Sequence, residues 1–311
     1  MSLAYNMKFY AGKAETRLND DLHLLSGKSK SNIKEEAKLI SKDFKEMGYK
    51  VNSKLCSPTL ITSQDFLKLA QYWKEVKNYS AGTMENKASA MRHILKECNN
   101  MKANLDNKAL GIESSERDIL NTQNENRGCR ALQESSINSI KDNSIKATVK
   151  LRINYGLRRD EALHSIWALS KGRNIGKDGI LSLQSSWTKN GRARSFQMAD
   201  GGAALKEAAA LVKNYEIKGR VEQFRGRLDR QITKLKTLDN NPDLHAHALR
   251  HNYAQSRYSQ LTGGLTAPAA GGLSYKNMDG AQKSLYNNAC SIIALELGHS
   301  RPEIANTYLG H

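Results

Sequence analysis

A polar stretch at residues 113–128 divides the chain into two longer segments that both carry apolar periodicity. The stretch lacks a regular spacing of apolar residues, which is typical of a linker and not of a packed element. A chain of 311 residues is also long for a single hydrophobic core. We therefore predict two domains, residues 1–112 and 135–311, joined by a linker at residues 113–134.

Helical spacing of apolar residues dominates both segments. In the first segment, Thr62 followed by Asp65 fits a capping box, and Ser80 stands where an N-cap should precede the next helix. In the second, two short extended pieces flank a turn signal at residues 189–191, which predicts a hairpin. The predicted fold class is mainly α with a small antiparallel β-sheet, with helices within residues 30–48, 63–77, 81–98, 135–170, 203–215 and 221–235 and strands at 180–183 and 193–198.

The charge of the chain indicates an anionic partner. The formal net charge is +17, with 48 Lys and Arg against 31 Asp and Glu. The excess lies in both halves, because residues 1–112 carry +7 and residues 135–311 carry +12. Two separate basic segments favour two surfaces that face one polyanion, such as DNA. Only five Phe and three Trp are present, which favours duplex DNA over single strands.

Membrane spans and export signals are excluded by the hydropathy pattern. The longest uninterrupted apolar run is the five residues 208–212, too short for a transmembrane helix or a secretory signal. We therefore expect a cytoplasmic, nucleoid-associated prokaryotic protein that does not bind membranes. Its cysteines should then stay thiols, since their wide spacing offers neither a disulfide framework nor a CxxC metal site: Cys56, Cys98, Cys129 and Cys290.

Four short segments of the second half concentrate Arg, Lys, His and Tyr: residues 155–161 (YGLRRDE), 189–194 (KNGRAR), 247–251 (HALRH) and 297–308 (LGHSRPEIANTY). These residue types suit attack of a tyrosine on a phosphodiester. Guanidiniums with fixed paired donors can hold the charge on the non-bridging oxygens. A phenol with a pKa near 10 needs a neighbouring base or cationic field before it becomes a nucleophile. Exchange of a phosphodiester for a phosphotyrosine keeps most of the bond energy, so neither ATP nor another cofactor is required.

In order and residue type, these segments resemble the tyrosine recombinase and phage integrase family. GLRRDE is similar to the family's first arginine box, HALRH to the second, and LGHSRPEIANTY to the closing box, with nine positions from His299 to Tyr308. The resemblance covers residues 135–308, whereas residues 30–110 share only a helical, basic pattern with the family. It implies a two-domain DNA clamp, in which a helical core-binding (SAM-like) domain precedes a tyrosine recombinase catalytic domain.

The resemblance also implies the function and the site. The protein would be a site-specific recombinase, an integrase of a mobile genetic element, that cleaves and rejoins duplex DNA through a 3′-phosphotyrosyl intermediate. We expect a tetramer on paired DNA sites and allow a monomer in the free protein. The implied roles are nucleophile for Tyr308, phosphate binding for Arg158 and Arg250, proton acceptor for His247, hydrogen bonding to the phosphate for His299, general acid for Lys189, and support for Glu161 and His251.

Basic residues outside these boxes are expected to contact DNA. Arg192 and Arg194 follow the turn that carries Lys189, and a basic face is expected on the helix that starts near residue 221. A solvated surface helix is the competing interpretation of that face. The predicted DNA-contacting side chains are Arg192, Arg194, Arg225, Arg227, Arg230, Lys87 and Arg92.

The sequence also departs from the family and leaves alternatives open. Residues 261–288, rich in Gly, Ala and Asn, read as an inserted loop with short helical pieces, and only three residues follow Tyr308. His247 and His251 form an HxxxH pair that could bind zinc, but Glu is missing beside the first His, and we predict no metal. The alternative functions are a type IB topoisomerase-like enzyme that relaxes DNA, and a DNA-binding regulator that does not cleave.

Overall fold

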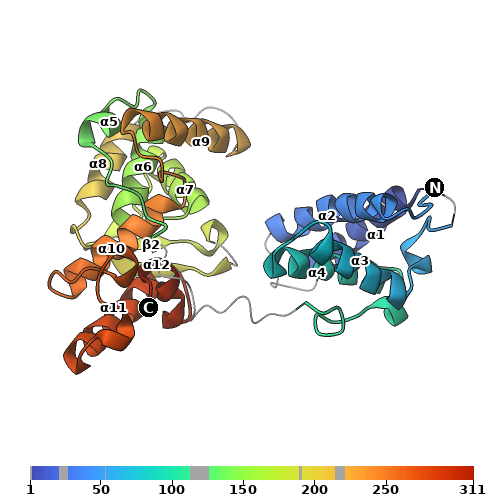
Figure 1. The fold of residues 1–311 in the computed structure, drawn as a ribbon. Helices are drawn as coiled ribbons and strands as arrows, with labels where there is room; N and C mark the ends of the chain where they lie inside the picture. Colours follow the sequence, from blue (N-terminus) through green and yellow to red (C-terminus); the bar gives the residue numbers. More distant parts are fainter. Residues whose placement is uncertain (1, 21–26, 53, 113–125, 189–190, 214–220) are drawn as a thin grey trace. The chain divides into compact units, whose positions relative to one another are not determined.

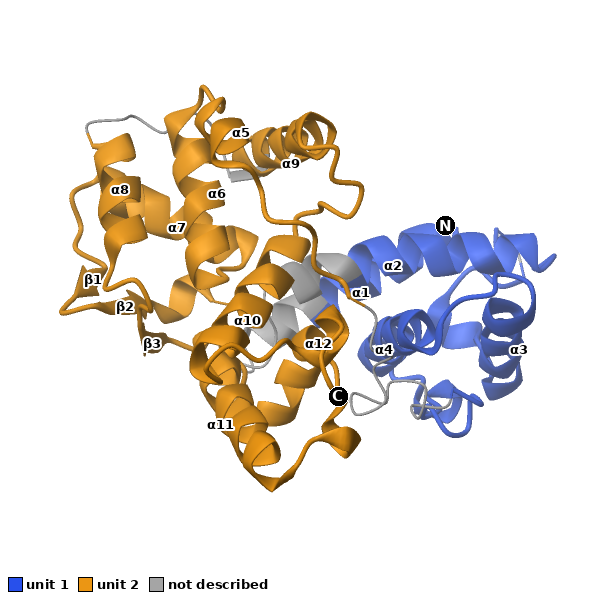
Figure 2. Ribbon diagram, turned by 60° about the vertical axis from the view of Figure 1, so that its left-hand side comes forward, with its two compact units in different colours: residues 1–118 blue, residues 119–311 orange. Residues whose placement is uncertain are grey.

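The computed structural model describes residues 2–20, 27–52, 54–112, 126–188, 191–213 and 221–311. The chain folds as two compact units, Met1–Asp118 and Ile119–His311, called unit 1 and unit 2 (Figure 2). Both are built mainly from helices, and one three-stranded antiparallel sheet belongs to unit 2 (Figure 1). The predicted fold class, mainly α with a small antiparallel sheet, is confirmed. None of the described helices is both long and apolar enough to cross a bilayer.

Unit 1 consists of α1 (Leu3–Asp20), α2 (Gly27–Glu46), α3 (Ser63–Glu75) and α4 (Ala81–Glu97), with short 3₁₀ turns at Pro58–Leu60 and Met101–Ala103. The expected caps are present. Thr62 and Asp65 form the capping box of α3, and the Ser80 hydroxyl accepts from the Thr83 amide at the start of α4. Helix α1 was not predicted from the sequence. Its buried Leu3, Met7 and Ala11 pack in the unit 1 core, and the helix packs on α2 and α4.

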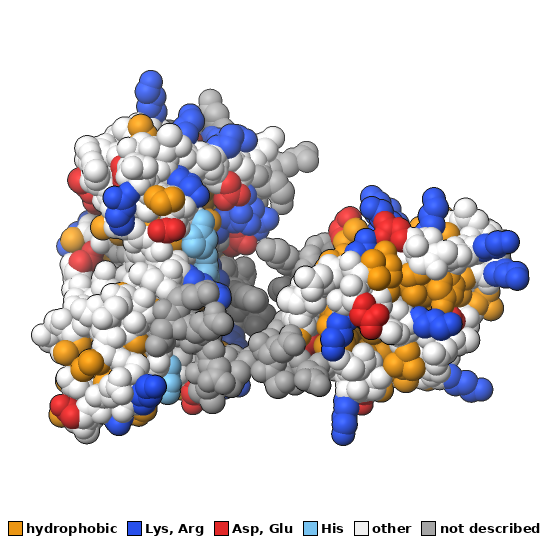
Figure 3. All heavy atoms as spheres, in the orientation of Figure 1, with side chains coloured by type: hydrophobic (Ala, Val, Ile, Leu, Met, Phe, Trp, Pro, Cys, Tyr) orange, Lys and Arg blue, Asp and Glu red, His pale blue; other side chains and the backbone are white. Residues whose placement is uncertain are grey.

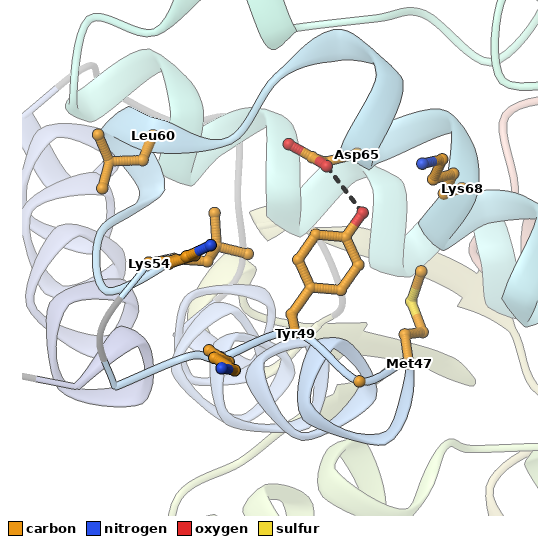
Figure 4. A pocket seen from close by; sticks show the side chains of 9 residues that line it. Met47, Tyr49, Lys54, Leu60, Asp65 and Lys68 are labelled. Atoms are coloured by element: carbon orange, nitrogen blue, oxygen red, sulfur yellow. Dashed lines mark hydrogen bonds between the residues drawn. The ribbon is translucent and has the colours of Figure 1, made fainter.

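A pocket of about 610 Å³ opens in unit 1 between the end of α2 and the start of α3. Figure 4 shows the Tyr49 phenol pointing at Asp65, with Lys54 and Lys68 on either side. The Tyr49 hydroxyl donates to Asp65 Oδ1 at 2.7 Å, and Asp65 Oδ2 accepts from Thr62. The residue that caps α3 therefore also holds the chain that follows α2.

Unit 2 begins with α5 (Glu134–Asn138), α6 (Asn143–Tyr155) and α7 (Arg159–Ser170). Three strands follow, and Figure 2 shows them at one edge of the unit: β1 (Gly176–Lys177), β2 (Ile180–Leu183) and β3 (Arg194–Gln197). In this sheet β2 is central and antiparallel to both neighbours, with Leu181 opposite Phe196. Leu181, Leu183 and Phe196 face a core shared with α6, α7 and α8 (Ala203–Val212) because side chains alternate across a strand.

The rest of unit 2 is α9 (Val221–Leu238), α10 (Ala248–Leu261), α11 (Gly280–Glu296) and α12 (Asn306–Leu309). α10 packs against α6, α11 and α12 (Figure 1). The helix ends of this bundle bring chain segments that are far apart in sequence to one region.

The segment predicted as an inserted loop, residues 261–288, is only partly a loop. Short 3₁₀ turns lie at Pro268–Ala270 and Tyr275–Asn277, but α11 already begins at Gly280. Asp279 and Gln282 form a capping box at this start, and Tyr286, Ala289 and Ile293 then bury one face of the helix. The last nine residues of the predicted loop are therefore helical, because a cap and an apolar stripe follow the Gly-rich part.

Much of the predicted linker, residues 113–125, lies outside the described residues. The following residues pack onto unit 2, since the Cys129 amide donates to Asn252 Oδ1 at 2.8 Å and Gln255 donates to Asn126. α5 begins at Glu134, the last residue of the predicted linker.

Candidate active site

The turn between α6 and α7 carries the first predicted arginine. Gly156 ends α6 in the left-handed conformation at φ +59°, and a Cβ on it would lie 2.4 Å from the Tyr253 side chain on α10. Glycine is thus required both by the backbone angle and by the close approach of α10. Arg158 then occupies the N-cap position of α7. The Glu161 carboxylate accepts from the Arg158 amide at 2.8 Å and from its Nη1 at 2.9 Å, which holds the guanidinium in place.

Arg250, on the first turn of α10, is 1% exposed and connects three segments. Its guanidinium donates to the carbonyl of Gly156, to the carbonyl of Leu297 and, through Nε at 3.1 Å, to the hydroxyl of Tyr308. Because these acceptors lie in the first box, at the α6–α7 turn, and at both ends of the closing box, this one buried side chain of the second box connects all three boxes.

His299 follows α11 in a turn that depends on a second glycine. Gly298 has φ +71°, and a Cβ there would lie 2.5 Å from Arg194 Nη1. The turn places His299 Nε2 at 3.3 Å from Arg250 Nη2 and at 3.4 Å from Arg158 Nη2. The same nitrogen lies 3.4 Å from the hydroxyl of Tyr308.

The Tyr308 hydroxyl therefore lies beside Arg250 of the second box and His299 of the closing box, and His299 in turn lies beside Arg158 of the first box. Tyr308 itself is 5% exposed, and its ring centroid is 4.8 Å from that of His251 and 5.9 Å from that of His247. The structure thus brings together most of the predicted site: Arg158, Glu161, His247, Arg250, His251, His299 and Tyr308. The predicted general acid, Lys189, lies outside the described residues.

Burial and cationic neighbours both lower the pKa values of two histidines in this cluster. Burial, followed by the charges of Arg250 and Arg158, lowers the pKa of His299 to about 3. Burial and then the guanidiniums of Arg250 and Arg152 also lower the pKa of His247. His247 is exposed, so water offsets part of this effect. Both imidazoles are therefore neutral near pH 7, and each ring has one nitrogen that can accept a hydrogen bond.

The buried carboxylate of Glu161 is the anion of the site. Burial by itself would raise the pKa of Glu161, but the Arg194 hydrogen bonds and the charges of Arg194, Arg158 and Arg250 outweigh it and lower the pKa to about 2. Burial lowers the pKa of Arg250 to about 10, which still leaves it protonated at neutral pH. The site thus presents cationic donors around a phenol, an arrangement suited to an anionic phosphate.

Arg194, one of the predicted DNA contacts, is paired inside unit 2. Its side chain is 6% exposed, and its two terminal nitrogens donate to both oxygens of Glu161 at 2.8 and 2.9 Å. Its Nε donates to the Glu296 carbonyl at 3.1 Å. Arg194 therefore supports the Glu161 carboxylate and the turn that bears His299. No local signal could have shown this, because its partners lie 33 and 102 positions away in sequence.

Three other predicted DNA contacts are paired within the protein. Lys87 is 3% exposed and lies 3.1 Å from Glu36 and 3.6 Å from Asp43, inside unit 1. Arg225 forms a two-pronged pair with Asp160, and Arg227 lies 3.3 Å from Asp142. The pairs of Arg225 and Arg227 explain part of the basic pattern on α9, because they attach this helix to the rest of unit 2.

The remaining predicted contacts reach the surface to different extents. Arg192 and Arg230 are exposed. Arg92 is half-buried, and its Nη1 donates to Asn107 Oδ1 at 2.9 Å. In Figure 3, Lys and Arg side chains are spread over the visible faces of both units, with acidic side chains among them. Among the described residues, no three His, Cys, Asp or Glu side chains gather as metal ligands would, so the HxxxH pair lacks further ligands there.

Acid should destabilise the protein through His251 and His299. The pKa of His251 is lowered to about 4 by burial and then by the charge of His247, against 6.5 for both histidines in an unfolded chain. The unfolded chain therefore binds more protons below about pH 6.5, and stability falls as the pH falls. Between pH 7.5 and 5.5 we expect a loss of about 1 kcal/mol per histidine, allowing for water at partly exposed rings, and a Tm lower by about 4 °C.

Thermal melts at pH 7.5 and 5.5 would check this expectation. The carboxyl of Glu161 does not contribute in this window, because its stabilising effect is lost only below about pH 4.5. In His251→Gln the pH dependence should become shallower. An equal Tm at the two pH values in the unsubstituted protein would contradict it.

Comparison with known proteins supports the fold. No family model matches the sequence, and no curated protein matches it. Among solved structures, the chain is similar to the XerH site-specific recombinase bound to its difH substrate in a pre-cleavage complex, with a TM-score of 0.53 and 14% identity over 99% of this chain and 94% of that one. A post-cleavage complex of XerH with a palindromic difH substrate gives a TM-score of 0.50 and 14% identity over 99% and 93% of the two chains. The chain has the fold of tyrosine recombinases.

Proposed function

We propose that this protein is a site-specific DNA recombinase that cleaves and rejoins duplex DNA through a covalent bond between Tyr308 and a 3′-phosphate. The observation that supports the proposal best is the position of the Tyr308 hydroxyl, 3.1 Å from Arg250 Nε and 3.4 Å from His299 Nε2. Phosphoryl transfer through a tyrosine needs a phenol, a guanidinium and an imidazole near one phosphorus atom, and this arrangement gathers the three groups from two different boxes.

The chemistry would proceed by attack of the Tyr308 oxygen on the phosphorus atom. The new O–P bond forms as the bond from phosphorus to the 5′ oxygen breaks, and the phenolic proton passes to His247. Arg158, Arg250 and His299 hold the non-bridging oxygens, and Lys189 protonates the departing 5′ oxygen. Attack by a 5′ hydroxyl on the phosphotyrosine reverses these steps and rejoins the strand without ATP.

The resting arrangement must open before DNA can react. Arg250 is 1% exposed and its Nε is bonded to the nucleophile itself. A phosphate can contact this guanidinium only when the Tyr308 phenol moves off it, which places the bound phosphate between the two groups. The proposed enzyme therefore exchanges the hydrogen bond between Arg250 and Tyr308 for a contact of each of these side chains with the phosphate.

DNA is the proposed partner of both units. The XerH structures contain DNA substrates, and basic residues occur throughout both halves of this chain. We propose that unit 1 is a helical core-binding domain and that the two units close on duplex DNA as a clamp. Recombination between two such sites requires a tetramer on paired DNA, with one active site for each exchanged strand.

A covalent adduct on DNA tests the proposal. The full chain would be incubated with nicked suicide duplexes made from the DNA that flanks its gene, and adducts would be digested and sequenced by mass spectrometry. A nucleotide attached to Tyr308 is the expected result. Attachment to another residue would show that Tyr308 is not the nucleophile, and binding without any adduct would favour a regulator with this fold. Adducts on every duplex together with relaxation of an arbitrary supercoiled plasmid would favour the topoisomerase alternative.

A further inference from the structure

Arg152 is a buried cation that the proposed reaction does not use. It lies in the last turn of α6 and is 3% exposed. Its Nε donates to the Leu157 carbonyl at 3.3 Å, and its Nη2 donates to the Ala246 carbonyl. Its Nη1 is buried and has no hydrogen-bond partner among the described residues. Burial lowers the pKa of Arg152 to about 10, so the side chain remains charged at neutral pH.

The two carbonyls that accept hydrogen bonds from Arg152 belong to residues that directly precede two residues of the site. Leu157 directly precedes Arg158, and Ala246 directly precedes His247. Leu157 lies five positions after Arg152, and Ala246 lies 94 positions after it. Each belongs to a loop that leads into a helix. A backbone carbonyl in such a loop has no partner from a regular element, so the guanidinium supplies one for each.

A guanidinium is suited to this task because its nitrogens form a rigid planar fork. Donors fixed in one plane set the distance between their acceptors, which a lysine ammonium on a flexible stem does not do. A bridge between the loops that precede Arg158 and His247 therefore sets the distance between the backbone positions of those two residues. Arg250 connects the same α6–α7 turn to the end of α11, because it donates to the Gly156 and Leu297 carbonyls.

We propose that Arg152 is a positioning residue for the Tyr308 site: its guanidinium bridges the Leu157 and Ala246 carbonyls and so fixes the separation of Arg158 and His247. The inference rests on the proposed function for its catalytic consequence, but its structural part stands apart from it. An apolar side chain would fill the same space without stranding a charge, so the bridge is the feature that distinguishes arginine at this position.

The charge of Arg152 also reaches His247. It is one of the cations that lower the pKa of that imidazole, after burial and Arg250. Removing the charge should raise the pKa of His247 toward its ordinary value. The charged and titratable groups around His247 are Arg250 and His251 on α10, Arg152 on α6, Arg158 before α7, His245 in the preceding loop and Tyr308 on α12.

Lys150 is a matched control on the same helix. It is also a buried cation, 6% exposed, but it lies two residues before Arg152 and pairs with Glu134 at 2.8 Å and Glu207 at 2.9 Å. Lys150→Met therefore removes a buried charge from α6 without touching the loops of the site. It separates a general loss of stability from a specific effect on Arg158 and His247.

The experiment compares Arg152→Met, Arg152→Lys and Lys150→Met in the full chain. His247 is titrated by NMR without DNA, and the rate of adduct formation is measured on the nicked duplex at saturating protein. Arg152→Met should raise the pKa of His247 and slow the adduct by about 100-fold with little change in DNA affinity. Arg152→Lys keeps the charge, so it should leave the pKa low yet slow the adduct about tenfold. Lys150→Met should change neither.

The outcomes separate this inference from the proposed function. A folded Arg152→Met protein that titrates His247 as the unsubstituted chain does, or that forms adduct within threefold of its rate, would overturn the inference. If Arg152→Met does not fold, Arg152→Lys decides: shifted amide resonances of Arg158 and His247 support the bridge, and unchanged ones overturn it. Absence of any adduct with the unsubstituted chain would instead overturn the proposed function, while the NMR titration still decides the role of Arg152.

Discussion

Tyr308→Phe should lose covalent adduct formation by at least about 10⁴-fold, because no other described group near Arg250 can replace the phenolic oxygen. The ring would still pack against His251, so the fold of α12 should be kept. Loss of the hydroxyl removes one acceptor from the buried Nε of Arg250, at a cost of about 1–3 kcal/mol in the free energy of unfolding. DNA affinity should stay within about threefold, since phosphate contacts elsewhere dominate it.

Tyr275→Phe is the matched control. Tyr275 also belongs to unit 2, and its hydroxyl accepts from Asn287 at 3.0 Å, away from the arginines of the site. This variant should form adduct at the rate of the unsubstituted chain. Adduct formation by Tyr308→Phe above about 1% of that rate would show that another residue is the nucleophile.

Arg250→Ala should reduce the rate of adduct formation by about 10³-fold and also destabilise unit 2. The same guanidinium that would hold the phosphate donates to the Gly156 and Leu297 carbonyls and to Tyr308. Arg250→Lys should not restore the rate, because one ammonium cannot reach three acceptors from three segments in a fixed plane. Single-turnover rates on the nicked duplex, DNA affinity and thermal melts would measure the three effects separately.

Arg257→Lys offers a comparison for the structural part of this effect. Arg257 lies two turns further along α10, and it pairs with Glu296 at 3.0 Å. We expect Arg257→Lys to lower the Tm, while the rate of cleavage stays within about tenfold of the unsubstituted rate. Cleavage by Arg250→Lys at the rate of Arg257→Lys would mean that Arg250 holds the fold together without acting on the phosphate.

Local features of the sequence predicted much of unit 1 and of the sheet. The Thr62 and Asp65 box, the Ser80 cap and the strand at residues 180–183 appear where they were expected. These depend on neighbours a few residues away, so a single sequence contains their cause. The missed helix α1 also had such a signal, in the spacing of Leu3, Met7 and Ala11.

Charged residues could not be interpreted in the same way. Lys87, Arg194 and Arg225 looked like free cations, and each is paired with an acidic residue more than thirty positions away. Whether an arginine faces DNA or a buried carboxylate depends on which elements pack together. Local sequence patterns do not contain that information.

By itself, the sequence determined the helix caps, the periodic cores and the order of the residue types that suit phosphoryl transfer, because each depends on short-range sterics or on side-chain chemistry. Only the tertiary structure decided that Arg250 bonds Tyr308, that Arg194 supports Glu161, and that Arg152 bridges the loops before Arg158 and His247. Those contacts join segments up to 94 positions apart, and only the packing of α6, α10, α11 and the sheet brings them within hydrogen-bond distance.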